Sequence, residues 1–373
     1  MSSSNKPLVT GLIPSYNHAK YIKESIQSMI DQDYENMEMI IIDDGSSDNS
    51  IEIIESMIPL CKKRFKRFEF RHRENKGVSA TLNEGIMWSK GKYLSPLASD
   101  DMAMPNKTSY LVDKLEKSGH KAAFGSVADM MNGKLIFGEK SQKTIYKFYD
   151  LFLLKKFIHG TASLINIDAL KNSGLYNEDI AVEDLYMWLK LTEDGSNLIC
   201  YPKVLAKYRT HDNNTVKYID IMFKNLLNII NLYKNNKYYD EALRNAKVIL
   251  VKLVKNLDDY ILTNNSSLDY YNGIINDIIT QAIECRNNYN KLAVYGYGTI
   301  TNLIKDYLPE TVIFFDKRAS YINSKDKIYN LNEITKQNFD KVLISAIGHE
   351  KEIIDLLTQN YKISIDKIYV FNL

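Results

Sequence analysis

The chain has 373 residues, of which 45% are hydrophobic and 25% are charged, as in ordinary globular proteins. This composition excludes whole-chain disorder, a collagen-like repeat and a small disulfide-stapled fold. Lysine plus arginine total 48 and aspartate plus glutamate total 46, and a net charge of +2 is too small for a dedicated nucleic-acid binder. We therefore expect about two or three globular domains and no nucleic-acid partner.

The first hundred residues alternate predicted strands and helices. Residues 8–13 are apolar and partly β-branched, which predicts a strand, and the apolar residues between 22 and 30 fall on one face of a helix. The alternation continues with strands at 37–42, 68–70 and 92–97 and helices at 51–58 and 78–89. This order is typical of a parallel sheet, in which ligands bind at the carboxyl ends of the strands. Three loops follow strands, so we expect them to meet at one edge: Pro14–His18, Asp43–Asp48 and Ser99–Asp101.

The pattern changes after residue 120. Strands are predicted at 122–127, 134–137, 161–165 and 197–208, with a turn at Asn132-Gly133 and a helix over 182–191. Residues 217–288 contain one glycine and no proline in long apolar-periodic stretches, which predicts a helical segment. A second alternation begins at Lys291 and predicts a small Rossmann-like α/β domain. The predicted domains are therefore 1–216, 217–288 and 289–373, and the helical segment is a candidate surface for a homo-oligomer.

No feature of the sequence indicates secretion or membrane insertion. The start, MSSSNKPLV, lacks the basic and apolar regions of a secretory signal. No apolar run approaches the roughly 18 residues that a membrane-spanning helix needs. The three cysteines form no Cys-x-x-Cys pair, which favours free thiols in a reducing compartment. We expect a cytoplasmic location. The eight basic residues within 61–76 are either a solvated surface or a contact with the inner face of the membrane.

Six short motifs occur in a fixed order in the N-terminal part of the chain: Pro14-Ser15-Tyr16-Asn17, Ile42-Asp43-Asp44-Gly45-Ser46, Asn75-Lys76-Gly77, Asn83-Glu84-Gly85, Gly91-Lys92-Tyr93 and Ser99-Asp100-Asp101. Together they resemble the family 2 glycosyltransferases, over about residues 6–215. The resemblance implies the α/β nucleotide-diphospho-sugar transferase fold called GT-A. It also implies an inverting, metal-dependent enzyme that moves a sugar from a nucleotide-diphosphate sugar to a glycan or lipid-linked acceptor in surface polysaccharide synthesis.

A carboxylate cannot bind a diphosphate directly, but Mn²⁺ or Mg²⁺ can bridge the two groups. By resemblance, Asp101 is the metal ligand and Asp100 contacts the ribose or supports the ligand. Ala98 stands where many family members have a third aspartate. The alternative interpretation of Asp100-Asp101 is a helix cap ahead of Pro105.

The resemblance also assigns contacts to the donor nucleotide. Asp43 would accept the imide N–H of uracil or thymine, which favours UDP, while Pro14 and Tyr16 would wall the base. The remaining residues assigned to the donor site are Asn17, Asp44, Asn75, Gly77, Asn83, Ser99, Asp100 and Arg209. The alternatives are an Asp-Gly-Ser-Ser turn after the second strand and a core position for Tyr16.

Two later motifs complete the predicted site. Glu183-Asp184 precedes an apolar helix, and the resemblance favours Asp184 as the catalytic base, although acidic residues also suit a helix start. The segment Tyr208-Arg209-Thr210-His211 resembles a tail that closes over the diphosphate. Arg209 would bind phosphate and His211 would bind metal or phosphate, unless the histidine is structural. His159 is a candidate acceptor contact.

The C-terminal domain allows two interpretations. Gly296-Tyr297-Gly298 follows a strand and Asp316 ends the next one, a pattern that resembles the dinucleotide-binding fingerprint, with Thr301 replacing its third glycine. We expect a domain used for assembly or acceptor positioning. A bifunctional protein with an NAD(P)-dependent oxidoreductase unit and a non-catalytic sugar-nucleotide-binding scaffold are the alternative functions.

Overall fold

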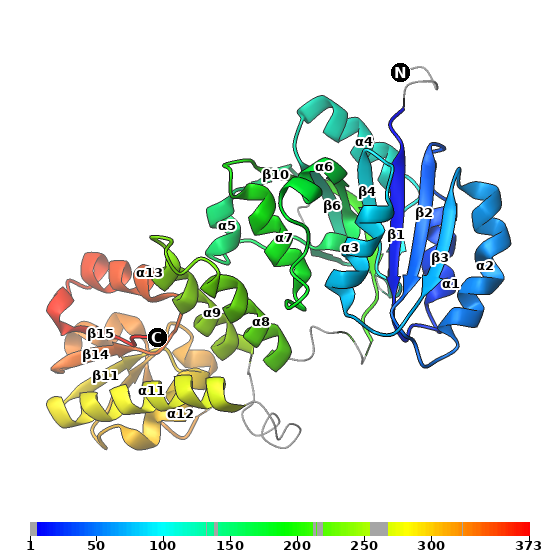
Figure 1. Ribbon diagram of the computed structural model, residues 1–373. Helices are drawn as coiled ribbons and strands as arrows, with labels where there is room; N and C mark the ends of the chain where they lie inside the picture. The colour runs from blue at the N-terminus through cyan, green and yellow to red at the C-terminus, as the bar shows by residue number, and fades with distance from the viewer. Residues whose placement is uncertain are drawn as a thin grey trace. The chain divides into compact units, whose positions relative to one another are not determined.

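The structure is a computed structural model that describes residues 6–131, 133–137, 141–211, 214, 219–253, 268–322 and 324–373. The chain divides into two compact α/β units, residues 1–242 and 243–373 (Figure 1). Helix α8, Ile219–Asn231, belongs to the first unit, where Asn225 Oδ1 accepts a hydrogen bond from the Ala181 backbone N–H at 2.7 Å. The domain limits expected at 216 and 288 stay predictions.

The first unit is built on a ten-stranded mixed sheet in the order β3-β2-β1-β4-β9-β6-β10-β5, with β7 beside β6 and β8 beside β10. Its strands are β1 Val9–Ser15, β2 Met37–Asp43, β3 Phe68–His72, β4 Tyr93–Pro96, β5 Met102–Ala103, β6 Ala122–Asp129, β7 Leu135–Phe137, β8 Thr144–Tyr146, β9 Ser163–Asn166 and β10 Leu198–Tyr208. Strands β1 to β4 are parallel. Strand β9 runs antiparallel to both β4 and β6, so β6 points the same way as β1.

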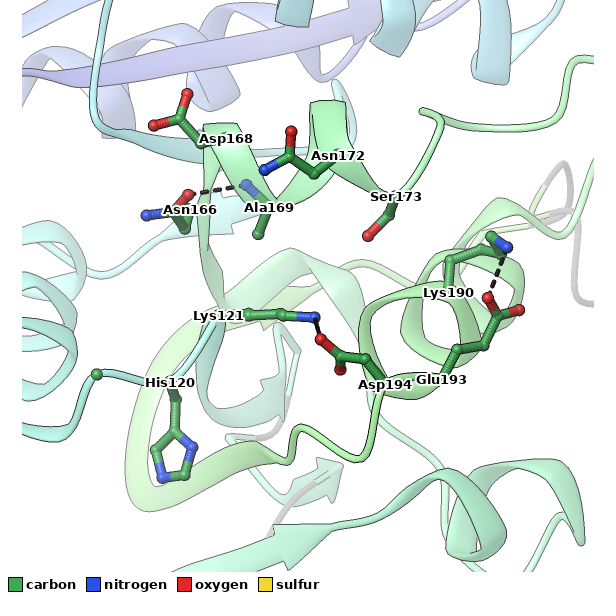
Figure 2. A pocket seen from close by; sticks show the side chains of 11 residues that line it. His120, Lys121, Asn166, Asp168, Ala169, Asn172, Ser173, Lys190, Glu193 and Asp194 are labelled. Carbon is green, nitrogen blue, oxygen red and sulfur yellow. Dashed lines mark hydrogen bonds and ion pairs between the residues drawn. The ribbon is translucent and has the colours of Figure 1, made fainter.

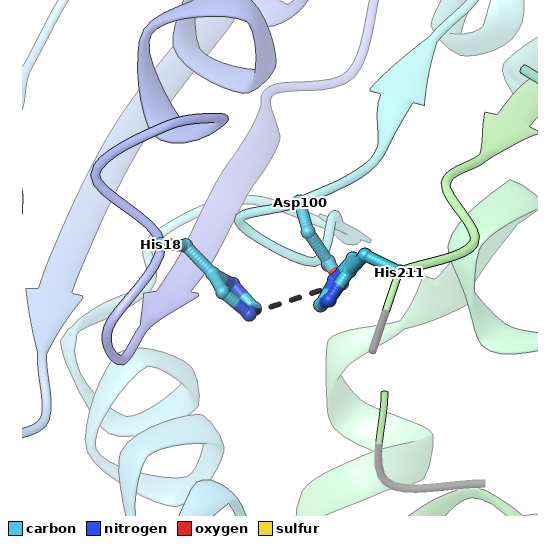
Figure 3. A group of neighbouring side chains, drawn as sticks. All are labelled: His18, Asp100 and His211. Atoms are coloured by element: carbon cyan, nitrogen blue, oxygen red, sulfur yellow. Dashed lines mark hydrogen bonds and ion pairs between the residues drawn. The ribbon is translucent and has the colours of Figure 1, made fainter. Parts of the chain in front are cut away.

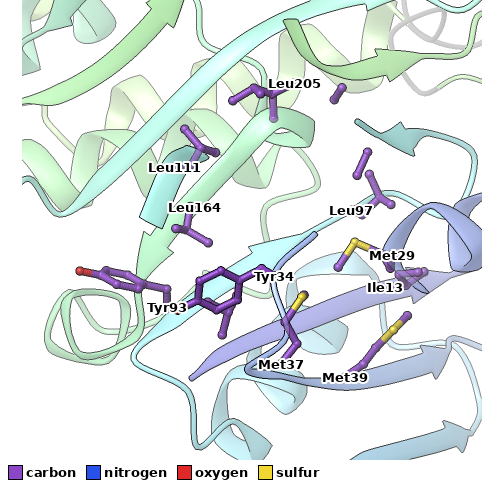
Figure 4. Close-up of a cluster of buried hydrophobic side chains, with 14 of the residues drawn as sticks. Ile13, Met29, Tyr34, Met37, Met39, Tyr93, Leu97, Leu111, Leu164 and Leu205 are labelled. Atoms are coloured by element: carbon purple, nitrogen blue, oxygen red, sulfur yellow. The ribbon is translucent and has the colours of Figure 1, made fainter. Parts of the chain in front are cut away.

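Helices cover both faces of this sheet: α1 Ile22–Ile30, α2 Ser50–Arg64, α3 Val78–Trp88, α4 Lys107–Ser118, α5 Phe148–Phe152, α6 Ile167–Asn172 and α7 Glu183–Thr192. Strand β2 is buried at every position. Met37 and Met39 pack on one face in the same core cluster as Met29 of α1 (Figure 4). On the opposite face, a Cβ on Gly85 of α3 would lie 2.4 Å from Leu12. Burial on two faces explains the apolar run 39–42 within β2.

The predicted elements of the first unit are present within a few residues of their expected limits. The hairpin at 122–137 forms as β6 and β7, although Asn132 lies outside the described residues. Five short or amphipathic elements were not predicted, namely α4, α5, α6, β5 and β8. The three cysteines are free and buried.

Arginines of the basic stretch 61–76 are bound within the first unit. Arg64 donates to the backbone carbonyls of the last residue of α1 and of two residues that follow it, and Arg67 pairs with Glu38 at 2.8 Å. Arg71 and Arg73 both pair with Glu84. The lysines of the stretch are exposed. These contacts account for the arginines without a membrane, and membrane contact stays a prediction.

The second unit contains a parallel sheet in the order β13-β12-β11-β14-β15. Its strands are β11 Leu292–Tyr295, β12 Ile313–Phe315, β13 Ile328–Tyr329, β14 Lys341–Ile344 and β15 Ile368–Val370, and its helices include α11 Leu268–Asn288, α12 Thr299–Ile304 and α13 Glu350–Asp355. Helix α9, Tyr239–Leu253, crosses the division between the units. The strand order reverses between β11 and β14, as in doubly wound folds. This confirms the small Rossmann-like α/β fold.

Among the residues that the structure describes, no helix combines the length and the apolar character needed to cross a bilayer.

Candidate active site

The three predicted loops meet at the carboxyl ends of β1, β2 and β4. The Asn17 backbone N–H donates to Ser46 Oγ at 2.8 Å, which joins the first loop to the second. A hydrogen bond of 2.7 Å between His18 Nδ1 and Ser99 Oγ joins the first loop to the third. The expected convergence of the loops is therefore confirmed.

The Asp43 carboxylate stabilises the loop that follows β2 by accepting hydrogen bonds. Its side chain is fully buried, and Oδ2 accepts hydrogen bonds from Ser15 Oγ at 2.9 Å and Ser46 Oγ at 2.7 Å, while the Ser46 backbone N–H donates to Oδ1. Asp44 accepts from the backbone N–H groups of Lys76 and Gly77 at 2.9 and 2.8 Å. Both carboxylates therefore shape loops, and their contacts to a nucleotide base stay predictions.

Asp100 lies between two imidazoles (Figure 3). His211 Nε2 lies 2.9 Å from Asp100 Oδ2, and His18 Nε2 lies 3.9 Å from the same oxygen. One ligand atom from each of the three side chains lies within 4.8 Å of the others, so the group could hold a metal ion. The chain brings them together from the ends of β1, β4 and β10.

Asp101 faces the interior instead. It is 1% exposed, and its two carboxylate oxygens accept from Thr161 Oγ1 at 2.7 Å and from the Arg209 backbone N–H at 2.9 Å. Burial and the neighbouring charge of Asp100 raise the pKa of Asp101 to about 7. Asp100, and not Asp101, thus belongs to the cluster that could hold a metal ion, and the role of Asp101 as a metal ligand stays a prediction.

Lys107, which the sequence analysis did not single out, lies fully buried beneath this motif. Its Nζ donates to the carbonyl oxygens of Pro96 and Thr161, both at 2.9 Å. Burial lowers the pKa of Lys107 to about 7, an effect that the nearby Asp101 opposes. The lysine ties the end of β4 to the turn before β9.

Glu183 and Asp184 open α7. Asp184 Oδ2 accepts a hydrogen bond from the Gly160 backbone N–H at 2.9 Å, and burial raises the pKa of Asp184 to about 6. Burial, followed by the charge of Asp184, raises the pKa of Glu183 to about 8. Both shifts favour the protonated carboxyl group, and the pKa of Glu183 is raised further than that of Asp184. This pattern suits Asp184 better as a base.

The turn Gly160–Ala162 connects the two acidic centres. Gly160 holds Asp184, and the next residue, Thr161, holds Asp101 through its hydroxyl group and Lys107 through its carbonyl oxygen. His159, just before the turn, packs its ring edge-on against Tyr208 at 5.0 Å. Burial lowers the pKa of His159 to about 4, which keeps its ring neutral.

The tail motif after β10 lies against α1. Arg209 pairs with Glu24, and its guanidinium lies 4.7 Å from the centre of the Tyr21 ring. Arg209 Nε also donates to the Asp100 carbonyl oxygen at 3.0 Å. The His211 ring lies 5.0 Å from Tyr21. His211 of the tail is thus part of the cluster with His18 and Asp100, and the binding of the diphosphate by the tail stays a prediction.

Other predicted donor-site residues lie outside this cluster. Asn83 exchanges hydrogen bonds of 2.9 Å with the backbone of Tyr176, and so holds the segment before α7. Tyr16 is 48% exposed, Asn75 is exposed, and Pro14 is partly buried near the end of β1. Of these, Tyr16 and Pro14 remain close in sequence to the converging loops, and their roles stay predictions.

A polar pocket of about 500 Å³ lies at the opposite edge of the sheet (Figure 2). Its walls come from the start of β6, from α6 and from the end of α7. Lys121 and Asp194 form an ion pair of 2.7 Å there. Because β6 runs parallel to β1, its first residues are remote from the carboxyl-end site.

The family model of glycosyl transferase family 2 matches residues 11–174, which include the three converging loops and the turn at Gly160. Residues 11–174 belong to this family. An uncharacterized glycosyltransferase of Haemophilus influenzae is 29% identical over 70% of this chain and 90% of its own length. The hyaluronan synthase of Pasteurella multocida is 25% identical over 88% of this chain, which spans 36% of that enzyme. The chain spans between 31% and 66% of five further glycosyltransferases, which are 31–33% identical to it.

The crystal structure of S. aureus TarS residues 1–349, in complex with UDP-GlcNAc, superimposes with a TM-score of 0.52 at 16% identity. The likeness covers 73% of this glycosyltransferase and 80% of the TarS chain, and it shows the shared GT-A fold.

The residues of the second unit that resemble a dinucleotide site form hydrogen bonds within that unit. Asp316 accepts hydrogen bonds from the backbone N–H groups of Tyr297 at 2.9 Å and Arg318 at 2.7 Å. Thr301 Oγ1, at the third-glycine position, lies 2.7 Å from Ser345 Oγ. The carboxylate at the position that binds ribose in dinucleotide folds is therefore hydrogen-bonded within the unit, and NAD(P) binding stays an alternative prediction.

Proposed function

We propose that the protein is an inverting glycosyltransferase that moves a sugar from a nucleotide-diphosphate sugar, with UDP as the nucleotide, to a hydroxyl of a glycan or lipid-linked acceptor. One observation carries the proposal. The turn at Gly160 and Thr161 joins the side chain of Asp184 to the acidic loop that contains Asp100 and Asp101. A base and a diphosphate-binding loop are thus held in fixed relation, as a displacement reaction requires.

Asp100 and His211 fit a divalent cation. A carboxylate oxygen and an imidazole nitrogen are suitable donors, and they lie 2.9 Å apart at a partly buried position. We propose that they hold Mn²⁺ or Mg²⁺, which neutralises the charge that develops on the leaving diphosphate. Asp101 supports this loop by fixing Thr161 and the backbone of Arg209.

Asp184 would accept the proton of the acceptor hydroxyl as that oxygen attacks the sugar. A base with a pKa near 6 is ionised at neutral pH and still basic enough to take a proton. The Gly160 N–H fixes one carboxylate oxygen and leaves the other for the acceptor. Asp43 would act on the nucleotide by holding the loop after β2.

The likeness to a hyaluronan synthase, which extends over 88% of this chain, supports a glycan acceptor and a role in polysaccharide synthesis. The first unit carries every residue of the proposed site. The second unit would position the acceptor or a partner copy.

The test is a transfer assay of the full chain with UDP-, GDP- and dTDP-sugars, with Mn²⁺, Mg²⁺ or EDTA. We expect metal-dependent release of UDP and, by NMR, a product with the anomeric configuration opposite to that of the donor. Asp184→Asn should lose transfer, whereas Asp168→Asn, an exposed acid of the remote pocket, should not. A product with the donor's configuration would contradict the inverting mechanism.

A further inference from the structure

His18 places a second imidazole beside Asp100. Its Nε2 lies 3.9 Å from Asp100 Oδ2, and the centres of the His18 and His211 rings are 5.4 Å apart, nearly perpendicular. A metal ion sits about 2 Å from each nitrogen or oxygen ligand, so donor atoms on one ion are about 3–4 Å apart. The three side chains point toward one another at close to this spacing (Figure 3).

The other ring nitrogen of His18 is occupied by a buried hydroxyl. Nδ1 lies 2.7 Å from Ser99 Oγ, and Ser99 is 3% exposed. When Nδ1 carries the proton and donates to Ser99, Nε2 keeps its lone pair on the side of Asp100. A hydrogen bond on the far nitrogen is the usual way in which proteins orient a metal-binding histidine.

The backbone around His18 is fixed as well. The His18 N–H donates to Ser50 Oγ at 3.1 Å, and the Ala19 N–H donates to Asp48 Oδ2 at 2.9 Å. Ser50 is the first residue of α2 and Asp48 lies in the loop just before it, so the loop after β1 is held by the segment that follows β2. The imidazole is therefore presented from a rigid loop, as a ligand must be.

We propose that His18 is a third protein ligand of the divalent cation and that its imidazole makes the site select Mn²⁺ over Mg²⁺. The inference rests on the proposed function, because the cation would serve the donor diphosphate. Mg²⁺ takes oxygen ligands and retains its waters, whereas imidazole nitrogen suits first-row transition ions better. A site with one carboxylate and two imidazoles therefore favours the transition ion.

The test measures metal binding by the full chain in the presence of UDP. Electron paramagnetic resonance follows free Mn²⁺, Mg²⁺ is measured by competition, and spin-echo spectra report nitrogen bound to Mn²⁺. In His18→Gln we expect the Kd for Mn²⁺ to rise about tenfold or more and one nitrogen coupling to disappear. The Kd for Mg²⁺ should change less than about twofold. The control is His120→Gln, which removes an imidazole from the remote pocket.

Ser99→Ala provides a second variant that keeps the ligand itself. It should weaken Mn²⁺ several-fold without removing a nitrogen coupling, because only the orientation of His18 is lost. Equal Mn²⁺ affinity and equal nitrogen coupling in wild type and His18→Gln would overturn the inference while leaving the proposed function intact. Failure of the wild-type protein to bind Mn²⁺ with UDP would overturn both.

Discussion

The backbone N–H of Gly160 donates to Oδ2 of Asp184 at 2.9 Å, and the same residue leaves no space for a side chain beside the carboxylate. A Cβ at position 160 would lie 2.6 Å from Asp184 Oδ1. The position of the proposed base therefore depends on a glycine outside its own helix.

Gly160→Ala should displace this carboxylate while the rest of the fold accommodates a methyl group, since the atoms it meets are at the end of a side chain. We expect the rate of sugar transfer to fall about 10²-fold, the lower range for loss of a general base. The Kd for UDP, measured by calorimetry, should stay within about twofold. Gly273→Ala, where a Cβ meets no atom within 4 Å, is the control. A large loss of UDP affinity in Gly160→Ala would show that the turn serves the donor instead.

The rate of transfer should depend on the ionisation of Asp184. Because burial raises its pKa to about 6, the rate should fall as the pH drops through about 6. Because burial and the charge of Asp184 raise the pKa of Glu183, Glu183→Gln should remain active at pH 7, whereas Asp184→Asn should lose about 10²–10⁴-fold in rate. A pH–rate profile of the three proteins checks this. If Glu183→Gln were inactive and Asp184→Asn active, Glu183 and not Asp184 would be the catalytic base.

Glu183 should also affect stability at high pH. Its pKa is raised from 4.5 to about 8 in the folded state, so folding binds its proton more tightly. The stabilisation is complete below about pH 4.5 and is lost as the pH rises through about 8. Urea unfolding at pH 5.5 and pH 9 should show that Glu183→Gln loses less stability than wild type over this interval. Equal losses would mean that the pKa of Glu183 is not raised in the folded state.

Lys107→Met should destabilise the first unit. The substitution retains most of the side-chain volume but leaves the carbonyls of Pro96 and Thr161 without their donor. We expect the free energy of unfolding to fall by about 2–4 kcal/mol, from about 1–3 kcal/mol for each buried unpaired group. Lys117→Met, on the exposed face of the same helix, should change it by less than about 0.5 kcal/mol. Chemical denaturation of both variants makes the comparison, and equal effects would contradict a structural role for Lys107.

Asp43→Ala distinguishes a contact to the base from support of its loop. A direct bond to the imide N–H would be made with UDP and not with CDP, so its loss would remove selectivity between them. Support through Ser15 and Ser46 predicts instead that both nucleotides bind more weakly, by similar factors. Calorimetric titration gives the ratio of the Kd for CDP to the Kd for UDP. If this ratio falls to one in Asp43→Ala, the result would support a direct contact between Asp43 and the base.

The sequence was sufficient to predict the loops that form the site. Apolar runs such as 39–42 reveal buried strands, and the strand–helix order places their ends at one edge. It was not sufficient to separate Asp100 from Asp101. Adjacent residues point in different directions, and which one faces the interior depends on Thr161, some 60 residues away.

Lys107 shows a second limit. A lysine at the first position of a helix is normally a solvated residue, and no periodicity marks it as buried. Its burial follows from two carbonyls that only the folded chain brings together. His18, by contrast, directly follows Asn17 in a predicted loop. Its position in that loop could have indicated a site residue, but the motif comparison ended at Asn17.

The pairing of Arg209 with Glu24 has a consequence for ionic strength. A diphosphate that binds this guanidinium would compete with the exposed Glu24 carboxylate for its charge. Dissolved salt weakens the attraction of Arg209 for either anion, so the two effects on donor binding oppose each other. Glu24 would thus reduce the dependence of donor affinity on salt concentration. Removing it in Glu24→Gln should make UDP bind more tightly at low salt and make that affinity fall more steeply as salt is added.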